Sequence, residues 1–139
     1  MKKSVLLVDD DKDLVASMKV VLEANGFDVT TASNGTDGLT KIQAKRPDLI
    51  VLDVMMDTDA EGFNVAYRLE SDPATRRIPI ILLIGFMDYV AVKRESFEFI
   101  EGRDWPAVKL MKKPVAMPEL LAAIRQLLAE AETLGVAVA

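Results

Sequence analysis

Short apolar runs alternate with amphipathic segments along the chain. Val5–Val8 and Leu49–Leu52 contain no polar residue, which is typical of parallel strands buried on both faces. With three further apolar segments they predict strands at residues 5–8, 27–31, 49–52, 78–84 and 108–111. Pro79 stands at the beginning of the fourth strand, where the missing N–H group of proline is tolerated.

The segments between these strands have helical periodicity. Their apolar stripes lie at Leu14–Leu22, Leu39–Ile42, Gly62–Leu69 and Leu120–Leu128. Asn25 and Gly26 form a typical end for the first helix, and Gly135 is the expected end of the last. The segment 86–107 fits both a helix face and an alternating strand. Strands that alternate with crossover helices predict an α/β fold, with a parallel sheet covered on both faces.

Composition narrows the fold to one domain and excludes several chemistries. The 139 residues predict a single domain over 1–139, with a core from about residue 3 to about residue 134 and a short C-terminal tail. The chain has no His and no Cys, which excludes zinc fingers, thiol or imidazole nucleophiles and disulfides. Any metal must therefore be held by oxygen, which points to Mg²⁺, Mn²⁺ or Ca²⁺.

Charge and hydropathy indicate where the protein acts. The net charge is −5, from 17 basic and 22 acidic residues, which argues against nucleic acid as a direct partner. No apolar run is long enough to span a bilayer, so we expect no membrane partner and a cytoplasmic location.

Polar side chains gather where the predicted strands end. Asp9, Asp10 and Asp11 follow the first strand, Asp53 ends the third, and Lys113 follows the fifth. The carboxyl ends of parallel strands meet at one edge, which is where ligands bind in such sheets. Asp11 stands where a helix N-cap belongs, and we assign it to that role. The other three carboxylates would repel one another, and a divalent cation would relieve this repulsion.

Three motifs resemble the receiver domain of bacterial two-component response regulators. They are Val5–Asp11, Pro47–Met56 and Lys113-Pro114, and the resemblance covers roughly residues 3–130. It implies a flavodoxin-like, doubly wound, five-stranded parallel sheet of order 2-1-3-4-5 with five helices.

The resemblance also implies a role for each site residue. Asp53 would accept a phosphoryl group from a sensor histidine kinase or a phosphotransfer protein. Mg²⁺ or Mn²⁺ would be held by Asp9, Asp10, Asp53 and the backbone carbonyl of Met55. Lys113 would pair with Asp53 and then with a phosphoryl oxygen, and the bond to Pro114 is often cis in the family.

Two positions depart from the family pattern. Ile84 stands where the family has a Thr or Ser that binds the phosphoryl group, and Leu110 stands where it has a Tyr or Phe that reports phosphorylation. Two functions therefore remain open. The first is a single-domain response regulator that accepts a phosphoryl group and signals by protein–protein interaction. The second is a pseudo-receiver, a protein-binding module that does not use phosphorylation.

The output partner is unknown from the sequence. The segment 86–112 is longer than in the family, and its Phe97, Phe99 and Trp105 could form an output or dimer surface or could fill the core. A homodimer through the face formed by helix 4, strand 5 and helix 5 is one option. The chain ends soon after the last helix, so we expect no attached DNA-binding or catalytic domain.

An enzymatic function is not expected. An aspartate-nucleophile phosphatase would need a second acid where Met55 stands. A flavodoxin-type cofactor site would need a Gly- or Ser-rich phosphate loop after the first strand, and none is present.

Overall fold

The structure, a computed structural model, describes residues 2–53, 61–85 and 108–133. The strands are β1 (Ser4–Val8), β2 (Asp28–Ala32), β3 (Leu49–Asp53), β4 (Ile80–Gly85) and β5 (Val108–Lys113). The helices are α1 (Lys12–Ala24), α2 (Gly35–Ala44), α3 (Glu61–Ser71) and α6 (Met117–Thr133). The described ranges thus hold four of the five expected helices, and segment 86–107 lies outside them.

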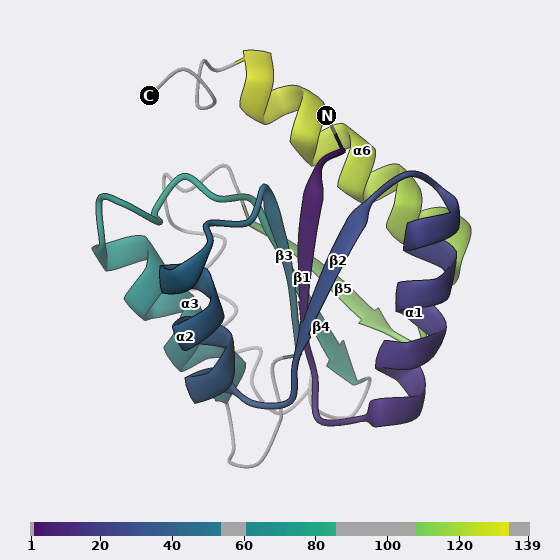
Figure 1. The fold of residues 1–139 in the computed structure, drawn as a ribbon, viewed down its shortest axis with the longest axis horizontal. Helices are drawn as coiled ribbons and strands as arrows, with labels where there is room; N and C mark the ends of the chain where they lie inside the picture. The colour runs from purple at the N-terminus through teal and green to yellow at the C-terminus, as the bar shows by residue number, and fades with distance from the viewer. Residues whose placement is uncertain (1, 54–60, 86–107, 134–139) are drawn as a thin grey trace.

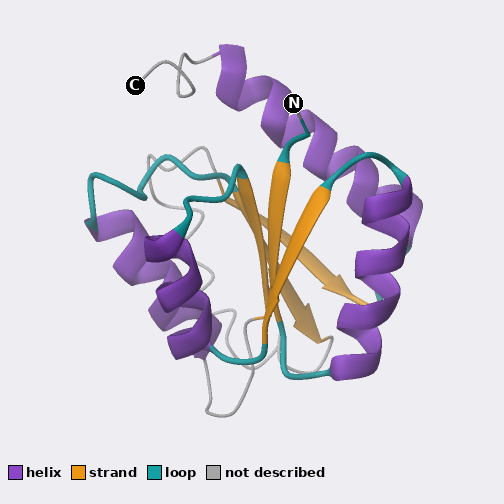
Figure 2. Cartoon of the chain, in the orientation of Figure 1, coloured by secondary structure: helices purple, strands orange, loops and turns teal. Residues whose placement is uncertain are grey.

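The five strands form one parallel sheet of order β2-β1-β3-β4-β5, as predicted. Figures 1 and 2 show α1 and α6 on one face of this sheet and α2 and α3 on the other. All strands run in the same direction, so the ends of β1, β3 and β5 reach the same edge of the sheet.

The apolar strands supply a core on each face of the sheet. Side chains alternate along a strand, so one set packs toward α2 and α3 and the other toward α1 and α6. The first cluster holds Leu6, Leu52 and Leu82 among others, and the second holds Leu7, Val51 and Leu83. This two-sided burial is the physical reason why the strand sequences carry almost no polar residue.

The ends of α1 follow the sequence prediction. Asp11 is the N-cap, and its Oδ1 accepts a hydrogen bond from the Leu14 N–H group at 3.1 Å. Asn25 is the C-cap, and Gly26 follows with a φ of 89°, a value that favours glycine. The expected stop at Gly135 lies outside the described residues.

All five strands differ from their predicted limits by one or two residues, and the physical reason is clear for three of them. β2 is shifted by one residue because its ladder begins where the Asp28 N–H group donates to the Lys3 carbonyl. β4 begins after Pro79, which lacks a donor but accepts through its carbonyl from the Ile50 N–H group at 3.0 Å. β5 continues to Lys113 because Lys112 and Lys113 still pair with the end of β4.

Two contacts tie neighbouring segments of the fold together. Gly38 of α2 lies so close to β1 that an added Cβ would be 3.1 Å from a methyl group of Val8. Near the N-terminus, the Lys3 ammonium forms an ion pair of 3.2 Å with Glu132 of α6. None of the described helices is long and apolar enough to cross a membrane.

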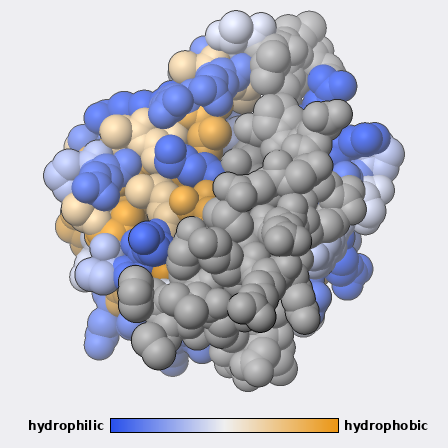
Figure 3. Space-filling view, turned by 180° about the vertical axis from the view of Figure 1, so that it is seen from behind, coloured by the Kyte–Doolittle hydropathy of each residue, from blue (hydrophilic) through white to orange (hydrophobic). Residues whose placement is uncertain are grey.

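Figure 3 shows the molecule from behind, where apolar residues reach the surface over part of that face. Among the described residues, Met111 and Val115 are half-buried and pack against the second core cluster.

We predict that the core contacts of α1 dominate its contribution to stability. Leu22→Ala should lower the free energy of unfolding by about 2–5 kcal/mol, because Leu22 is fully buried and its removal leaves a cavity. Val20→Ala on the same helix should change it by less than about 0.5 kcal/mol, because Val20 is 67% exposed. Urea unfolding of the two variants measures the difference, and equal losses would contradict the packing described for α1.

Candidate functional site

The alternation of side chains brings three charged residues to one face at the sheet edge. Asp9 follows β1, and its N–H group still bonds the Ala32 carbonyl at 3.1 Å, which extends the ladder by one residue. Asp53 ends β3 and Lys113 ends β5. Residues two positions apart in a strand share a face of the sheet. The residues two positions before these three are Leu7, Val51 and Met111, and all of them pack in the second cluster.

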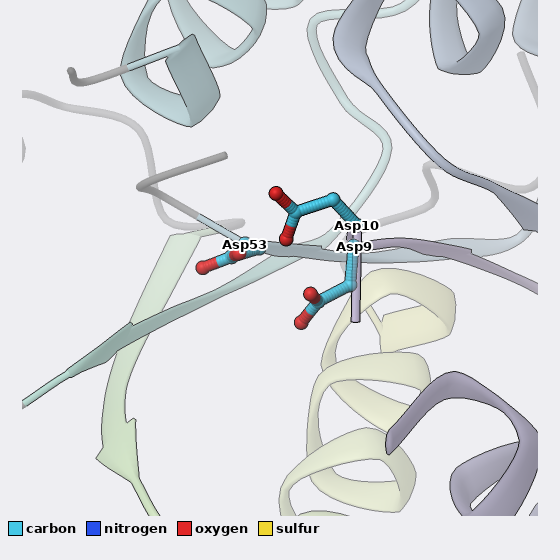
Figure 4. A group of neighbouring side chains, drawn as sticks. All are labelled: Asp9, Asp10 and Asp53. Atoms are coloured by element: carbon cyan, nitrogen blue, oxygen red, sulfur yellow. The ribbon is translucent and has the colours of Figure 1, made fainter. Parts of the chain in front are cut away.

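The three candidate carboxylates lie together as predicted. One oxygen from each of Asp9, Asp10 and Asp53 lies within 4.8 Å of the other two. Figure 4 shows the three side chains at the neighbouring ends of β1 and β3. Asp9 is 3% and Asp53 4% exposed, whereas Asp10 faces solvent. The cluster therefore has a buried side and an open side.

Lys113 bridges the two buried carboxylates. Its Nζ lies 3.0 Å from Asp9 Oδ2 and 3.2 Å from Asp53 Oδ1. Burial by itself lowers the pKa of Lys113, but the hydrogen bond to Asp9 and the charge of Asp53 outweigh it and raise the pKa above 10.5. The ammonium therefore stays charged at neutral pH. The Lys113-Pro114 peptide bond is cis, which agrees with the resemblance to receiver domains.

Asp9 is held at both of its oxygens. Oδ2 accepts from Lys113, and Oδ1 accepts from the N–H group of Asp11 at 2.9 Å. Asp11 therefore has a second role besides capping α1, one that its sequence position does not predict. The residue type at position 11 does not indicate this role, because the hydrogen bond to Asp9 comes from the main-chain N–H group.

The donor set suits a hard divalent cation. Three carboxylates face one ammonium, so the cluster keeps an excess of negative charge. All the side-chain donors are oxygen atoms, which Mg²⁺ and Mn²⁺ prefer. Met55 lies outside the described residues, as do Phe97, Phe99 and Trp105.

Ile84 and Leu110 pack on the other face of the sheet. Ile84 is fully buried in the first core cluster, and Leu110 is half-buried against the same cluster. In the ladder, Ile84 pairs with Lys112 and Leu110 with Leu82. The structure thus places an apolar contact, without a hydroxyl group, at the end of β4 beside the charged cluster.

Comparisons with known proteins give a consistent picture. The model of the response regulator receiver domain matches residues 5–125. The chain is 34% identical over 132 residues to the alkaline phosphatase synthesis transcriptional regulatory protein PhoP of Bacillus subtilis, covering 95% of this chain and 51% of that protein. It is 31% identical to the phosphate regulon transcriptional regulatory protein PhoB of Rhizobium meliloti, covering 95% and 55%. The chain thus spans about half the length of these curated relatives.

Solved structures share the fold. A putative response regulator from Chloroflexus aurantiacus matches with a TM-score of 0.75 and 30% identity, over 93% of this chain and 99% of that one. A CheY-like receiver domain protein from Methanospirillum hungatei matches with a TM-score of 0.76 and 27% identity, over 96% and 98%.

Receiver domains are signalling modules that interact with histidine kinases and bind Mg²⁺ at an acidic pocket, and they have autophosphatase activity. Asp9, Asp10, Asp53 and Lys113, which belong to the motifs that resemble this family, lie at the strand ends described above, and the family model spans residues 5–125. The chain belongs to the response regulator receiver domain family of two-component systems.

Proposed function

We propose that this protein accepts a phosphoryl group on Asp53 and signals by binding another protein. The observation that carries this proposal is the Lys113 bridge, with Nζ at 3.0 Å from Asp9 and 3.2 Å from Asp53. The bridge places one mobile positive charge beside the candidate nucleophile. Phosphoryl transfer needs such a charge, because negative charge spreads over the equatorial oxygens in the transition state.

Each residue of the site has a role in this proposal. A carboxylate oxygen of Asp53 attacks the phosphorus atom of the donor, and the bond to the donor's leaving group breaks. Lys113 turns from the Asp53 carboxylate to an oxygen of the transferred group, while its second anchor at Asp9 keeps the ammonium in place. Asp9 in turn keeps its position through the Asp11 N–H group.

Asp9, Asp10 and Asp53 would hold the metal, with the Met55 carbonyl as the further ligand implied by the family. When bound, Mg²⁺ or Mn²⁺ would neutralise phosphoryl oxygens and offset the repulsion between donor and carboxylates. Because Asp9 already has a donor at each oxygen, Asp10 and Asp53 are the better candidates for direct ligands.

The proposed phosphodonor is a sensor histidine kinase or a phosphotransfer protein, and the proposed output is a protein contact. A homodimer through the face that includes β5 and α6 is one form of that output. PhoP and PhoB are transcriptional regulatory proteins by name, and this chain spans about half of each. A net charge of −5 favours protein over nucleic acid as the direct partner of this domain.

A second candidate function is a protein-binding module that does not use phosphorylation. It is favoured by Ile84 and Leu110, which pack in one apolar cluster where the family has a hydroxyl group and an aromatic ring. Neither side chain can bond a phosphoryl oxygen, so a phosphoryl group would have less effect on this part of the sheet.

Phosphorylation can be tested by intact-mass analysis after incubation with a small-molecule phosphodonor. We expect a gain of one phosphoryl group that requires Mg²⁺ and is lost in Asp53→Asn, because Asp53 is the proposed nucleophile and lies beside Lys113 and the proposed metal ligands. Circular dichroism of the variant checks its fold. A gain that persists in Asp53→Asn would contradict the assigned nucleophile, and no gain with any donor or kinase would favour the second candidate.

Metal binding can be tested with Asp10→Asn. This variant should bind Mg²⁺ at least about tenfold more weakly, because it removes the solvent-exposed carboxylate of the cluster. Asp13→Asn is the matched control, since it removes the same charge from the first turn of α1 outside the cluster. Titration calorimetry measures both affinities, and equal losses would mean that general charge, not the cluster, binds the ion.

The missing hydroxyl group can be restored with Ile84→Thr. A hydrogen bond to a charged phosphoryl oxygen contributes about 1–3 kcal/mol, so phosphorylation by a small donor should become about tenfold faster. Ile84→Val is the matched control, because Val has the shape of Thr without the hydroxyl group. Rates are read by mass analysis over time. If both variants phosphorylate at the same rate, the loss of the hydroxyl group is not what limits this site.

A further inference from the structure

A groove lies beside the acidic cluster, along the open edge of the sheet. It has a volume of about 420 Å³ and is lined by residues of α1, the end of β2 and α2, together with Asp9. Figure 1 shows β2 at the front of the sheet with α1 on one side and α2 on the other. The size falls within the range of small-molecule sites, about 300–1,000 Å³.

The lining of the groove is part apolar and part basic, and we refer to these two parts as its floor and its rim. Val15, Ala16 and Ala32 form apolar parts of its lining, and Lys12, Lys19 and Lys41 supply three ammonium groups. Because Asp9 and Asp37 also line the groove, its lining carries a formal charge of +1 in a protein whose net charge is −5.

The carboxylates that face the groove are already paired. Asp37 forms an ion pair of 3.4 Å with Lys41, and Asp9 is held by Lys113 at 3.0 Å. Lys12 and Lys19, in contrast, have no ion pair or hydrogen-bonded side-chain partner among residues 2–53, 61–85 and 108–133. These two lysines lie two helical turns apart on α1, about 10 Å along its axis, so both can reach an anion between them.

The open edge of β2 does not favour a peptide strand as the occupant. The Lys41 ammonium donates a hydrogen bond to the Thr31 carbonyl, which points away from β1. A lysine over an edge carbonyl blocks the ladder that an added strand would need. The remaining polar groups of the groove, including the Ser33 side chain, suit a compact ligand.

We propose that this groove binds an organic phosphate of the nucleotide type. Its phosphate groups would pair with Lys12 and Lys19, and its ring would lie on the floor of Val15, Ala16 and Ala32. This site adjoins the phosphoacceptor site, with Asp9 common to both, but it does not depend on phosphorylation of Asp53.

The proposal can be tested by titrating the purified protein with ADP in metal-free buffer that contains EDTA. Calorimetry gives the affinity, and amide chemical shifts locate the ligand. We expect saturable binding below about 10 mM, with the largest shifts at Val15, Ala32 and Ser33. Asp53→Asn should bind ADP as the unmodified protein does. Shifts centred on Asp53 and Lys113 would overturn the proposal, and so would the absence of saturable binding.

Matched variants separate a specific site from general charge. Lys12→Gln with Lys19→Gln should weaken ADP binding by at least about tenfold. Lys2→Gln with Lys109→Gln changes the net charge equally at exposed positions outside the groove. This control should change the affinity by less than about twofold. Equal losses in the two double variants would overturn the proposal.

Two partial ligands test the roles of floor and rim. Pyrophosphate should bind more weakly than ADP because it leaves the apolar floor uncovered, and adenosine should bind more weakly because it lacks the charges. Pyrophosphate that binds as tightly as ADP would contradict the role of the floor. Adenosine that binds as tightly as ADP would contradict the role of the lysines.

Discussion

The Lys113 ammonium between two buried carboxylates is the interaction on which the rest of the site depends. Asp9 and Asp53 are almost fully shielded from water, and their charges would repel one another without a counter-charge. Lys113 supplies that charge from the far strand of the sheet, so it ties the end of β5 to the ends of β1 and β3. A buried carboxylate pair is stable here because the parallel sheet brings a cation to the same face.

The same geometry divides the domain into two chemically different faces. Asp9, Asp53 and Lys113, at the ends of β1, β3 and β5, are charged and lie on the face of the sheet that α1 and α6 cover. Ile84 near the end of β4 and Leu110 in the middle of β5 point to the other face and belong to the apolar core under α2 and α3. The charged cluster and the apolar contacts of Ile84 and Leu110 therefore belong to opposite faces of the sheet, and Ile84 comes close to the cluster only because it lies at the strand end. A signal between them has to pass around the strand ends.

Much of this arrangement is predictable from sequence because strands buried on both faces must be apolar. Val5–Val8 and Leu49–Leu52 could hardly be solvent-exposed helices, and the aspartates directly after them had to meet at one edge. Strand limits were less predictable, because ladder bonds such as that from Asp28 N–H to Lys3 depend on the neighbour and not on side-chain type. The anchoring of Asp9 by the Asp11 N–H group is invisible in sequence for the same reason. The basic groove is not predictable from the sequence either, because its lysines come from two helices, α1 and α2, and only the fold determines how far apart these helices lie.

The ion pair between Lys3 and Glu132 has a consequence for joining this domain to others. It holds the start of β1 against the last turns of α6, at the amino edge of the sheet. The acidic cluster lies at the carboxyl edge, a full strand length away. Lys3 and Glu132 therefore both lie at the pole of the domain opposite to the aspartates, so a segment attached at these residues starts away from the acidic cluster. The architecture is suited to modular attachment at one pole and chemistry at the other.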